Sequence, residues 1–506
     1  MPTFAAVDIG ANSVRLLISR LQRHRLHPIH ADREVTRLGE SVFRTGMLSS
    51  DAMAQTIQVL RRFHRAAQSH GVNAVRVVAT SSLRDARNAS AFIDWVRGAT
   101  GWKVEVISGI EEGRLIHLAI MANLRGAASS RVLLFDLGGG SCEVTTSIGG
   151  QIQDMVSLPL GAVRLTREFL QNDPPKKGEL EQVREYIAEE IARFYGRAIA
   201  AHVQMVVATS GTAAALAGAY TARRASKSAA VPAQAVVKVA SKLAKMSAAE
   251  RANMPGINTR RAEIIVSGAM VFAELLTRYK LPGFRYSPLG LRDGILTQMA
   301  ADYDRHTSFQ KRIESQRRDA LVAMGSRYEV NAKFAVTVRD LAIKLFAGMK
   351  KVHQLPPEYE EWLTAAAMLH EVGAYVNRAG RRRHTYYLIS HSEIFGYSVY
   401  QRQIIAAIAR YVGKSYPAPD TRPMRPLTAE DKQLVPKAVM LLRLARALQQ
   451  SRRGIVTDVG VKVQAETVSL QLITHRAGAD LELWALNKER SYFRAVFGRE
   501  LFAAVS

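Results

Sequence analysis

Short apolar runs that end in polar, glycine-containing turns recur along the first 300 residues. Residues 4–7 (Phe-Ala-Ala-Val) lead into Asp8-Ile9-Gly10-Ala11-Asn12-Ser13, and residues 132–135 (Val-Leu-Leu-Phe) lead into Asp136-Leu137-Gly138-Gly139-Gly140-Ser141-Cys142-Glu143. Apolar runs of this length, bounded by turn residues, are typical of buried strands. Because the second stretch repeats the order of strand, Asp, apolar residue, Gly and Ser, the pattern predicts two related α/β segments.

The residues around these two loops predict alternating strands and helices. In the first segment, residues 14–18 are expected to pair with the first strand, residues 52–69 to form a helix, and residues 74–79 and 104–107 to form strands. In the second, strands are expected at 143–148, 151–156 and 204–208, with a helix over 177–202 and helical spacing within 222–249. The prediction is two similar α/β halves with a cleft between them.

From about residue 305 the spacing of the apolar residues becomes helical. Val338, Leu341 and Leu345 recur three or four positions apart, and a second helix is expected over 362–369. Alternation over 459–463 and 468–472 then predicts a hairpin, and residues 488–504 have a helical pattern. We therefore expect four domains, with the bounds 1–124, 125–304, 305–452 and 453–506.

Length and charge agree with several domains that handle anions. A chain of 506 residues exceeds the size at which single cores stop growing, about 250–300 residues. Its 70 Lys and Arg against 44 Asp and Glu give a net charge of +26, which attracts anionic partners. Phosphate-rich ligands fit this charge, nucleic acid and a membrane surface are rivals, and a solvated basic surface explains it equally well. The charge supports a site without locating it.

The single cysteine and the start of the chain indicate a cytoplasmic protein. One cysteine, Cys142, excludes an intramolecular disulfide and a cysteine-rich metal site. No histidine lies near Cys142 in the sequence, so we interpret it as a packed side chain, not a catalytic thiol. No apolar run approaches the ~18 residues of a membrane span, and the first residues do not have the pattern of a signal peptide.

Three stretches carry candidate chemistry. The glycines at 138–140 have no Cβ atoms, so their N–H groups can approach phosphate oxygens, while acidic residues at both ends of the loop can hold a divalent cation. Arg84 follows a Ser/Thr turn that opens a helix and suits phosphate, although it could instead cap that helix or pair with Asp85. Glu111 and Glu112 begin another helix, where the helix dipole alone favours carboxylates, but they lie where open α/β sheets bind ligands.

Together these motifs resemble the exopolyphosphatase and guanosine pentaphosphate phosphatase family. The resemblance is carried by residues 8–13, 79–84, 107–116 and 136–143, and continues in the same order at 158–165, 210–212, 261–265 and 290–294. It implies an α/β fold class: two ribonuclease-H-like domains of the actin, sugar-kinase and heat-shock ATPase superfamily, then an all-α HD-like domain and a small α/β C-terminal unit.

The resemblance also implies roles for individual residues. Glu112 matches the family's catalytic carboxylate, the general base on water, and Arg84 matches its phosphate-binding arginine. The implied Mg²⁺ holders are Asp8, Asp136 and Glu143. The implied phosphate contacts are Asn12, Ser13, Arg84, Gly138, Gly139, Gly140 and Ser141. A cation could use only some of the acidic residues, since Mg²⁺ keeps several waters.

The helical segment resembles the family's HD-like domain with one acidic change. Glu371 stands after His370 where that domain has Asp, and His353 and His384 lie nearby in the sequence. The longer acidic side chain favours a binding and dimerisation module over a second metal site. The run Arg381-Arg382-Arg383 could guide a long polyanion, or could be a solvated turn.

The resulting hypothesis is a Mg²⁺-dependent exopolyphosphatase that releases terminal orthophosphate from inorganic polyphosphate. Two alternatives remain open: hydrolysis of guanosine pentaphosphate to the tetraphosphate, and a polyphosphate or alarmone sensor without turnover, against which Glu112 speaks. The first loop, Gly10-Ala11-Asn12-Ser13, differs from those of kinases and ATPases. We expect a cytoplasmic homodimer with no membrane partner and no specific nucleic acid.

Overall fold

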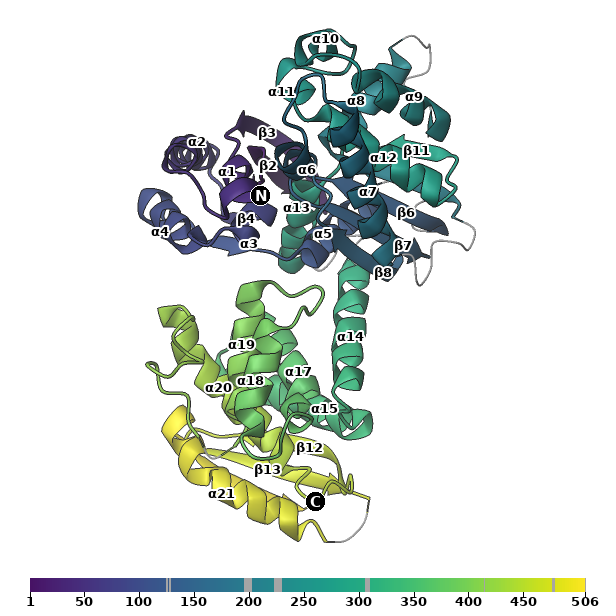
Figure 1. Ribbon diagram of the computed structural model, residues 1–506. Helices are drawn as coiled ribbons and strands as arrows, with labels where there is room; N and C mark the ends of the chain where they lie inside the picture. Colours follow the sequence, from purple (N-terminus) through teal and green to yellow (C-terminus); the bar gives the residue numbers. More distant parts are fainter. Residues whose placement is uncertain are drawn as a thin grey trace. The chain divides into compact units, whose positions relative to one another are not determined.

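The chain folds into two compact units, Met1–Ile313 and Glu314–Ser506. The computed structural model shown in Figure 1 describes residues 1–123, 126, 129–194, 203–222, 230–304, 310–413, 415–475 and 478–505. Among these residues, no helix is both long and apolar enough to span a membrane. The finer division into four domains stays a prediction.

The first unit opens with a five-stranded sheet in the order β3-β2-β1-β4-β5. The first three strands form antiparallel hairpins, and β4 and β5 then add in parallel on the other side of β1. The strands are β1 (Thr3–Ile9), β2 (Ser13–Gln22), β3 (Arg25–Val35), β4 (Ala74–Ala79) and β5 (Val104–Val106). The helices are α1 (Gly39–Thr45), α2 (Ser50–Ser69), α3 (Ser81–Asp85), α4 (Ala89–Thr100) and α5 (Gly109–Asn123).

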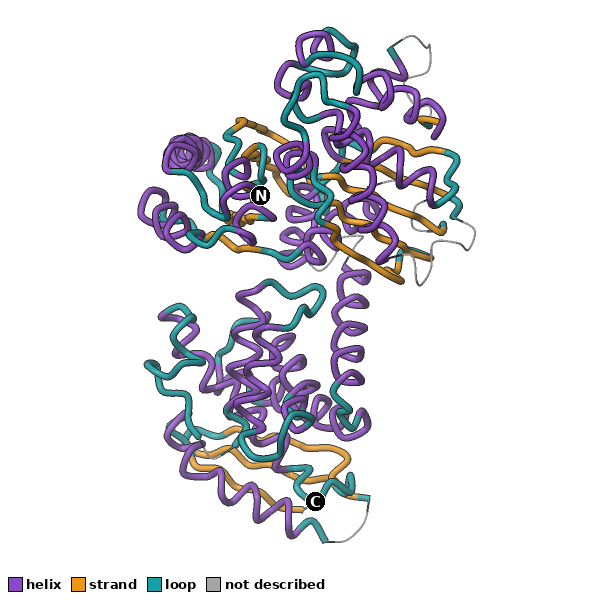
Figure 2. The backbone as a smooth tube through the Cα atoms, viewed as in Figure 1, coloured by secondary structure: helices purple, strands orange, loops and turns teal. Residues whose placement is uncertain are grey.

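A second sheet repeats this plan, in the order β10-β11-β9-β6-β7-β8. Here β6, β7 and β8 are the antiparallel hairpins, and β9 and β11 add in parallel beside β6. The strands are β6 (Arg131–Leu137), β7 (Cys142–Ile148), β8 (Gln151–Leu158), β9 (Met205–Thr209), β10 (Val231–Pro232) and β11 (Gly283–Tyr286). The helices are α6 (Ala162–Phe169), α7 (Lys177–Phe194), α8 (Ser210–Thr221), α9 (Ala233–Leu243), α10 (Ala248–Ala252), α11 (Thr259–Ala262), α12 (Ile265–Arg278) and α13 (Leu291–Tyr303). This repeated strand order confirms the predicted pair of ribonuclease-H-like sheets, which Figure 2 shows in orange.

Two helices join the sheets and so position the cleft. Helices α5 and α13 contact each other, α13 also packs on β1, and α5 also packs on β7 and β8. Gly294 permits the close approach, because a Cβ there would overlap the carbonyl oxygen of Leu115. Apolar residues of both sheets and both helices share one buried cluster, which includes Phe4, Val132 and Ile295. The first turns after β1 and β6 therefore lie in one compact unit.

The second unit is helical and ends in a small sheet of order β12-β13-β14. Its helices are α14 (Gln310–Arg327), which begins just before the division, α15 (Ala332–Gly348), α16 (Lys350–His353), α17 (Glu358–Leu369), α18 (Arg381–His391), α19 (Val399–Arg410), α20 (Ala429–Ala447) and α21 (Asp480–Phe497). Its strands are β12 (Val456–Val463), β13 (Thr467–Thr474) and β14 (Glu500–Val505). One apolar core includes the predicted face of α15 and the predicted hairpin.

The end of the chain differs from its predicted helix over 488–504. Helix α21 ends at Phe497, and Gly498 adopts the left-handed conformation, with φ of 64°, that terminates many helices. Residues 500–505 then pair with β13 as a parallel strand, which buries Leu501 beside Val468. The helix predicted over 177–202 is confirmed as far as Phe194, and residues 195–202 lie outside the described residues.

Candidate active site

Two hairpin turns of the same construction face one cavity. Asp8 lies near the carboxyl end of β1 and Asp136 near that of β6. The Gly10 N–H donates to the Ser13 carbonyl at 3.2 Å, and the Gly138 N–H donates to the Ser141 carbonyl at 2.9 Å. The cavity has a volume of about 290 Å³. Eight residues singled out from the sequence line it: Asp8, Asn12, Ser13, Glu112, Asp136, Gly138, Gly139 and Ser141.

The glycines at 138–140 serve both close packing and the lining of the cavity. Gly140 does not line the cavity, and a Cβ there would overlap Ser81 and lie 2.5 Å from a ring carbon of Phe43. A Cβ on Gly139 would lie 3.1 Å from the Cβ of Ala11, on the facing turn. Gly139 therefore lets the two turns approach each other closely, Gly140 makes room for Ser81 and Phe43, and of the three glycines only Gly138 and Gly139 border the cavity.

Three carboxylates lie close together at this site. Ligand oxygens of Glu112, Asp136 and Glu143 all lie within 4.8 Å of one another. Asp8 lies in the same cavity but is not a member of this group. The first of the three comes from the first turn of α5, and the other two face each other across the β6–β7 hairpin.

This acidic group fits a divalent cation. Glu143 is 1% exposed; its Oε1 accepts a hydrogen bond of 2.7 Å from the Ser157 hydroxyl, whereas its Oε2 is buried without a hydrogen-bond partner among the described residues. Asp136 accepts a hydrogen bond from the Thr209 hydroxyl. Carboxylate oxygens are the ligands that Mg²⁺ prefers, and an unpartnered buried oxygen within the group is a free position for one.

Burial raises the pKa of every carboxyl in the group. Burial and then the neighbouring Asp136 raise the pKa of Glu143 to about 7. Burial and then Glu143 raise the pKa of Glu112 well above its ordinary value, while Arg84 opposes this shift. Burial also raises the pKa of Asp8 and of Asp136. Three ionised carboxylates so close together need a compensating positive charge.

Arg84 acts on Glu112. Its Nη1 donates to Glu112 Oε2 at 3.2 Å and to the Ile107 carbonyl at 2.8 Å, and its Nη2 donates to the Ser141 hydroxyl at 3.3 Å. The alternative of a pair with Asp85 is wrong, because Asp85 pairs with Arg164. Arg84 is not among the residues that line the cavity, but Glu112 and Ser141, to which it donates, both line it.

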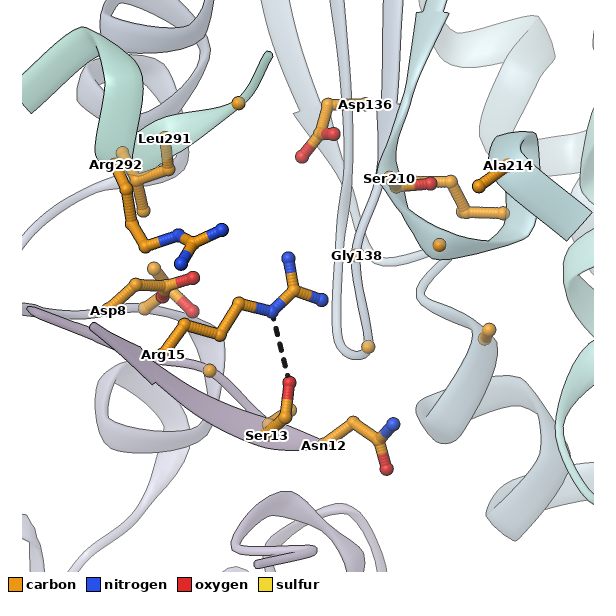
Figure 3. A pocket seen from close by; sticks show the side chains of 18 of the residues that line it. Asp8, Asn12, Ser13, Arg15, Asp136, Gly138, Ser210, Ala214, Leu291 and Arg292 are labelled. Atoms are coloured by element: carbon orange, nitrogen blue, oxygen red, sulfur yellow. Dashed lines mark hydrogen bonds between the residues drawn. The ribbon is translucent and has the colours of Figure 1, made fainter. Parts of the chain in front are cut away.

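Four arginines to which the sequence analysis assigned no role complete the cavity wall. Arg15, Arg33, Arg261 and Arg292 line the cavity, and among the described residues none of them pairs with a carboxylate. Asp8 on β1 is in register with Arg15 on β2, and Arg15 with Arg33 on β3. Figure 3 shows Arg15 and Arg292 extending toward the middle of the cavity, and a dashed line marks the bond of 3.2 Å from Arg15 Nε to the Ser13 hydroxyl.

The arginines destabilise one another in the free protein. Burial, then Arg15 and Arg292, lower the pKa of Arg33 to about 10. Burial, then Arg33 and Arg15, lower the pKa of Arg261 to about 10. Like charges directly opposite each other on neighbouring strands are unfavourable, so this arrangement indicates a ligand with several negative charges. The signals in the sequence were an arginine inside the apolar strand 14–18, and the position of Arg261 and Arg292 in two of the stretches that carry the resemblance.

The histidines of the second unit do not form a comparable group. Among the described residues, the three carboxylates above are the only cluster with metal-ligand spacing. Both ring nitrogens of His353 are engaged, Nε2 with the Phe346 carbonyl and Nδ1 with the Leu355 N–H, each at 2.8 Å. Glu371 pairs with Arg452, and in the described part of the chain it forms no cluster of metal-ligand spacing with His370 and His384.

Cys142 has the surroundings of a packed side chain. It is fully buried in the core of the second sheet, and burial, with the nearby Glu143, raises the pKa of its thiol well above the ordinary value. A thiol without thiolate character is a poor nucleophile.

The strand order repeated in the two sheets is that of the ribonuclease-H-like fold, and its cavity brings an acidic group together with four arginines that pair with no carboxylate of the described residues. The chain belongs to the Ppx/GppA phosphatase family. The family profile matches residues 17–303, and the profile of Ppx/GppA phosphatase domain III matches residues 317–490. This confirms the resemblance seen in the sequence and supports a phosphohydrolase activity.

Solved structures agree with this assignment. A Ppx/GppA family member from Aquifex aeolicus is 29% identical with a TM-score of 0.52, and the match covers 60% of this chain and 99% of that one. An exopolyphosphatase-like protein is 28% identical with a TM-score of 0.56, over 60% and 98%. An exopolyphosphatase from Cytophaga hutchinsonii is 22% identical with a TM-score of 0.56, over 59% and 98%, and shares the fold.

Proposed function

We propose that the protein is a divalent-cation-dependent exopolyphosphatase, which hydrolyses the terminal phosphate from inorganic polyphosphate. The observation that carries the proposal is the cavity wall of Arg15, Arg33, Arg261 and Arg292, none of which has a carboxylate partner among the described residues. A chain of phosphates with a charge on every unit would satisfy all four, whereas a single phosphate monoester would leave most of them uncompensated.

In the proposed reaction the terminal phosphoryl group lies between the arginines and the acidic group. Glu112 takes a proton from the attacking water as its oxygen bonds to phosphorus, and the shortened chain leaves with the electrons of the broken P–O bond. Arg84 holds the Glu112 carboxylate in place and opposes the rise in its pKa, which keeps it able to accept that proton.

Asp136 and Glu143 would hold the divalent cation. When bound, the cation would supply positive charge that keeps these carboxylates ionised and offsets charge on the phosphoryl oxygens. Asn12, Ser13, Gly138, Gly139 and Ser141 offer hydrogen-bonding groups around the cavity.

Hydrolysis of guanosine pentaphosphate is the second candidate, supported by an aromatic side chain in the cavity lining. Tyr286 is 40% exposed there, and its ring offers a face on which a purine base can stack. Both substrates present a terminal phosphoric anhydride to the same acidic group, so the preference depends on what lies beyond the terminal phosphate.

Phosphate release from the two substrates in parallel tests the proposal. With Mg²⁺, the wild type should release phosphate from long-chain polyphosphate faster than from guanosine pentaphosphate, and a chelator should stop release. Glu112→Gln should lower the rate by about 10²–10⁴-fold, as expected for loss of a general base. Asp94→Asn, an exposed change on α4, is the matched control and should leave the rate unchanged.

Three results would contradict parts of the proposal. No release from either substrate would favour the sensor without turnover. Release from guanosine pentaphosphate alone would establish the second candidate. A Glu112→Gln protein as active as the Asp94→Asn control would exclude Glu112 as the base.

A further inference from the structure

A second group of arginines lies in the helical unit, at the ends of three helices that pack together. Helix α18 contacts α19, and α19 contacts α20, as Figure 1 shows. Arg381 and Arg382 open α18, Arg410 closes α19, and Arg443 and Arg446 lie near the end of α20. We call these five residues the α18 arginine group.

The acidic residues near this group are already engaged. Glu489 accepts two hydrogen bonds from Arg443, of 2.7 and 3.1 Å, and Glu371 pairs with Arg452. Of the described residues, no carboxylate pairs with Arg381, Arg382, Arg410 or Arg446. Arg381, Arg382 and Arg410 therefore have no paired carboxylate among the described residues, and Arg446 is attracted only by Glu371 and Glu489, which Arg452 and Arg443 already engage.

Arg382 is the centre of the group. Its guanidinium lies against the backbone at Gly413, where a Cβ would overlap it, and its side chain is half-buried. It forms no hydrogen bond with the other described residues. Burial, followed by Arg446, Arg381, Arg443 and Arg410, lowers the pKa of Arg382 to about 10.

The position of these charges in α18 is also unfavourable without a ligand. Arginines in the first turn of a helix meet the positive end of the helix dipole, which favours an anion there instead. A half-buried, unpaired guanidinium loses hydration without a compensating hydrogen bond. Both effects reverse when an anion binds, because the anion pairs with the arginines and with the helix end at once.

We propose that the α18 arginine group is a second binding site, separate in its residues from the catalytic cavity, for the phosphate groups of a condensed phosphate. The compact, half-buried cluster suits a short, densely charged anion better than a nucleic acid, whose charges are spread along an exposed backbone. The choice of a condensed phosphate rests on the proposed function, whereas the site itself rests on the placement of the arginines.

Counting bound tripolyphosphate by titration calorimetry tests this proposal. In the full-length Glu112→Gln protein, which blocks turnover, two molecules of tripolyphosphate should bind per chain. Adding Arg382→Gln should remove one of them, with affinity at that site falling about tenfold or more. Adding Arg378→Gln, a change of the same charge on an exposed residue just before α18, should leave both.

A separate assay identifies the source of the ligand. In the otherwise wild-type protein, Arg382→Gln should leave phosphate release from tripolyphosphate unchanged, which also shows that the variant folds. If the KM for long polyphosphate rises, the site holds a distant part of the substrate. If that KM is unchanged while the second tripolyphosphate is lost, the site takes a separate condensed phosphate. Both results support the site.

Other results would overturn it. The proposal fails if the Glu112→Gln, Arg382→Gln double variant still binds two tripolyphosphates, each with an affinity within twofold of that in Glu112→Gln alone. It also fails if the Glu112→Gln protein binds only one tripolyphosphate and adding Arg261→Gln removes that one. It also fails if Arg382→Gln abolishes binding of a 20-nucleotide RNA but not of tripolyphosphate. Arg446→Gln provides the same comparison should Arg382→Gln not fold. A protein that binds two tripolyphosphates but hydrolyses neither substrate would contradict the proposed function and leave the second binding site supported.

Discussion

Replacing Arg261 with glutamine should stabilise the free protein and weaken its binding of the substrate. The guanidinium of Arg261 lies against Gly211, where a Cβ would overlap it, and has no hydrogen-bond partner among the described residues. Its neighbours Arg33 and Arg15 repel it, with only Tyr286 opposing. The short helix α11 should survive the change, because Asn258 caps it through the backbone N–H of residue 261.

The size of the effect follows from the pKa. Burial and the two neighbouring arginines lower the pKa of Arg261 from 12.5 to about 10, which corresponds to about 3 kcal/mol against the charged form in the folded state. Part of the side chain is exposed, and salt at physiological strength screens charges over about 8 Å, so we expect about 1–2 kcal/mol of this in solution. The melting temperature of the free protein should rise by roughly 2–4 °C.

Thermal unfolding with and without tripolyphosphate measures both effects. Wild type should gain stability from ligand bound at both sites, whereas Arg261→Gln should gain only what binding at the α18 arginine group supplies, and its KM for polyphosphate should rise about tenfold or more. The matched control is Arg260→Gln on the same helix, which loses only an exposed pair with Glu34 at 3.5 Å and should change neither value greatly. An Arg261→Gln protein that melts below wild type without ligand, or that keeps its KM, would refute this reasoning.

Three further changes probe the site and the second unit. Glu143→Gln should raise the Mg²⁺ concentration for half-maximal phosphate release roughly tenfold or more, and an unchanged Mg²⁺ titration would remove Glu143 from the cation site. Gly140→Ala should destabilise the protein by about 1–3 kcal/mol in urea unfolding, since the new Cβ meets Ser81 and Phe43, and a neutral result would show that these two side chains move aside without cost. Burial lowers the pKa of His370 to about 4, below its unfolded value near 6.5, so the unfolded chain binds more protons between these values. Stability should therefore fall by up to about 3 kcal/mol as the pH drops from 6.5 to 4; His370→Gln should lose this slope, and equal slopes in both proteins would assign it to other groups.

Much of the fold follows from local pattern. The strand predicted at 74–79 and the helix predicted at 52–69 match β4 and α2 to within two residues, and the predicted strands before the two loops are β1 and β6, one in each sheet. Apolar runs and helical spacing depend only on residues close together in the chain, so they can be read without the fold. The predicted terminal helix was wrong because residues 500–505 pair with β13, a contact set by distant residues.

The sequence by itself, through its resemblance to one family, determined that the loops 8–13 and 136–143 and the carboxylate of Glu112 belong to a phosphate-binding site. Only the tertiary structure placed Glu112 within 4.8 Å of Asp136 and Glu143, and showed that Gly140 packs against the facing lobe. Only the register of β1, β2 and β3 aligned Asp8 with Arg15 and Arg33. The reason is physical: a strand's pattern specifies which face a side chain occupies, whereas its neighbours across the sheet depend on pairing between strands and on helices that close the cleft.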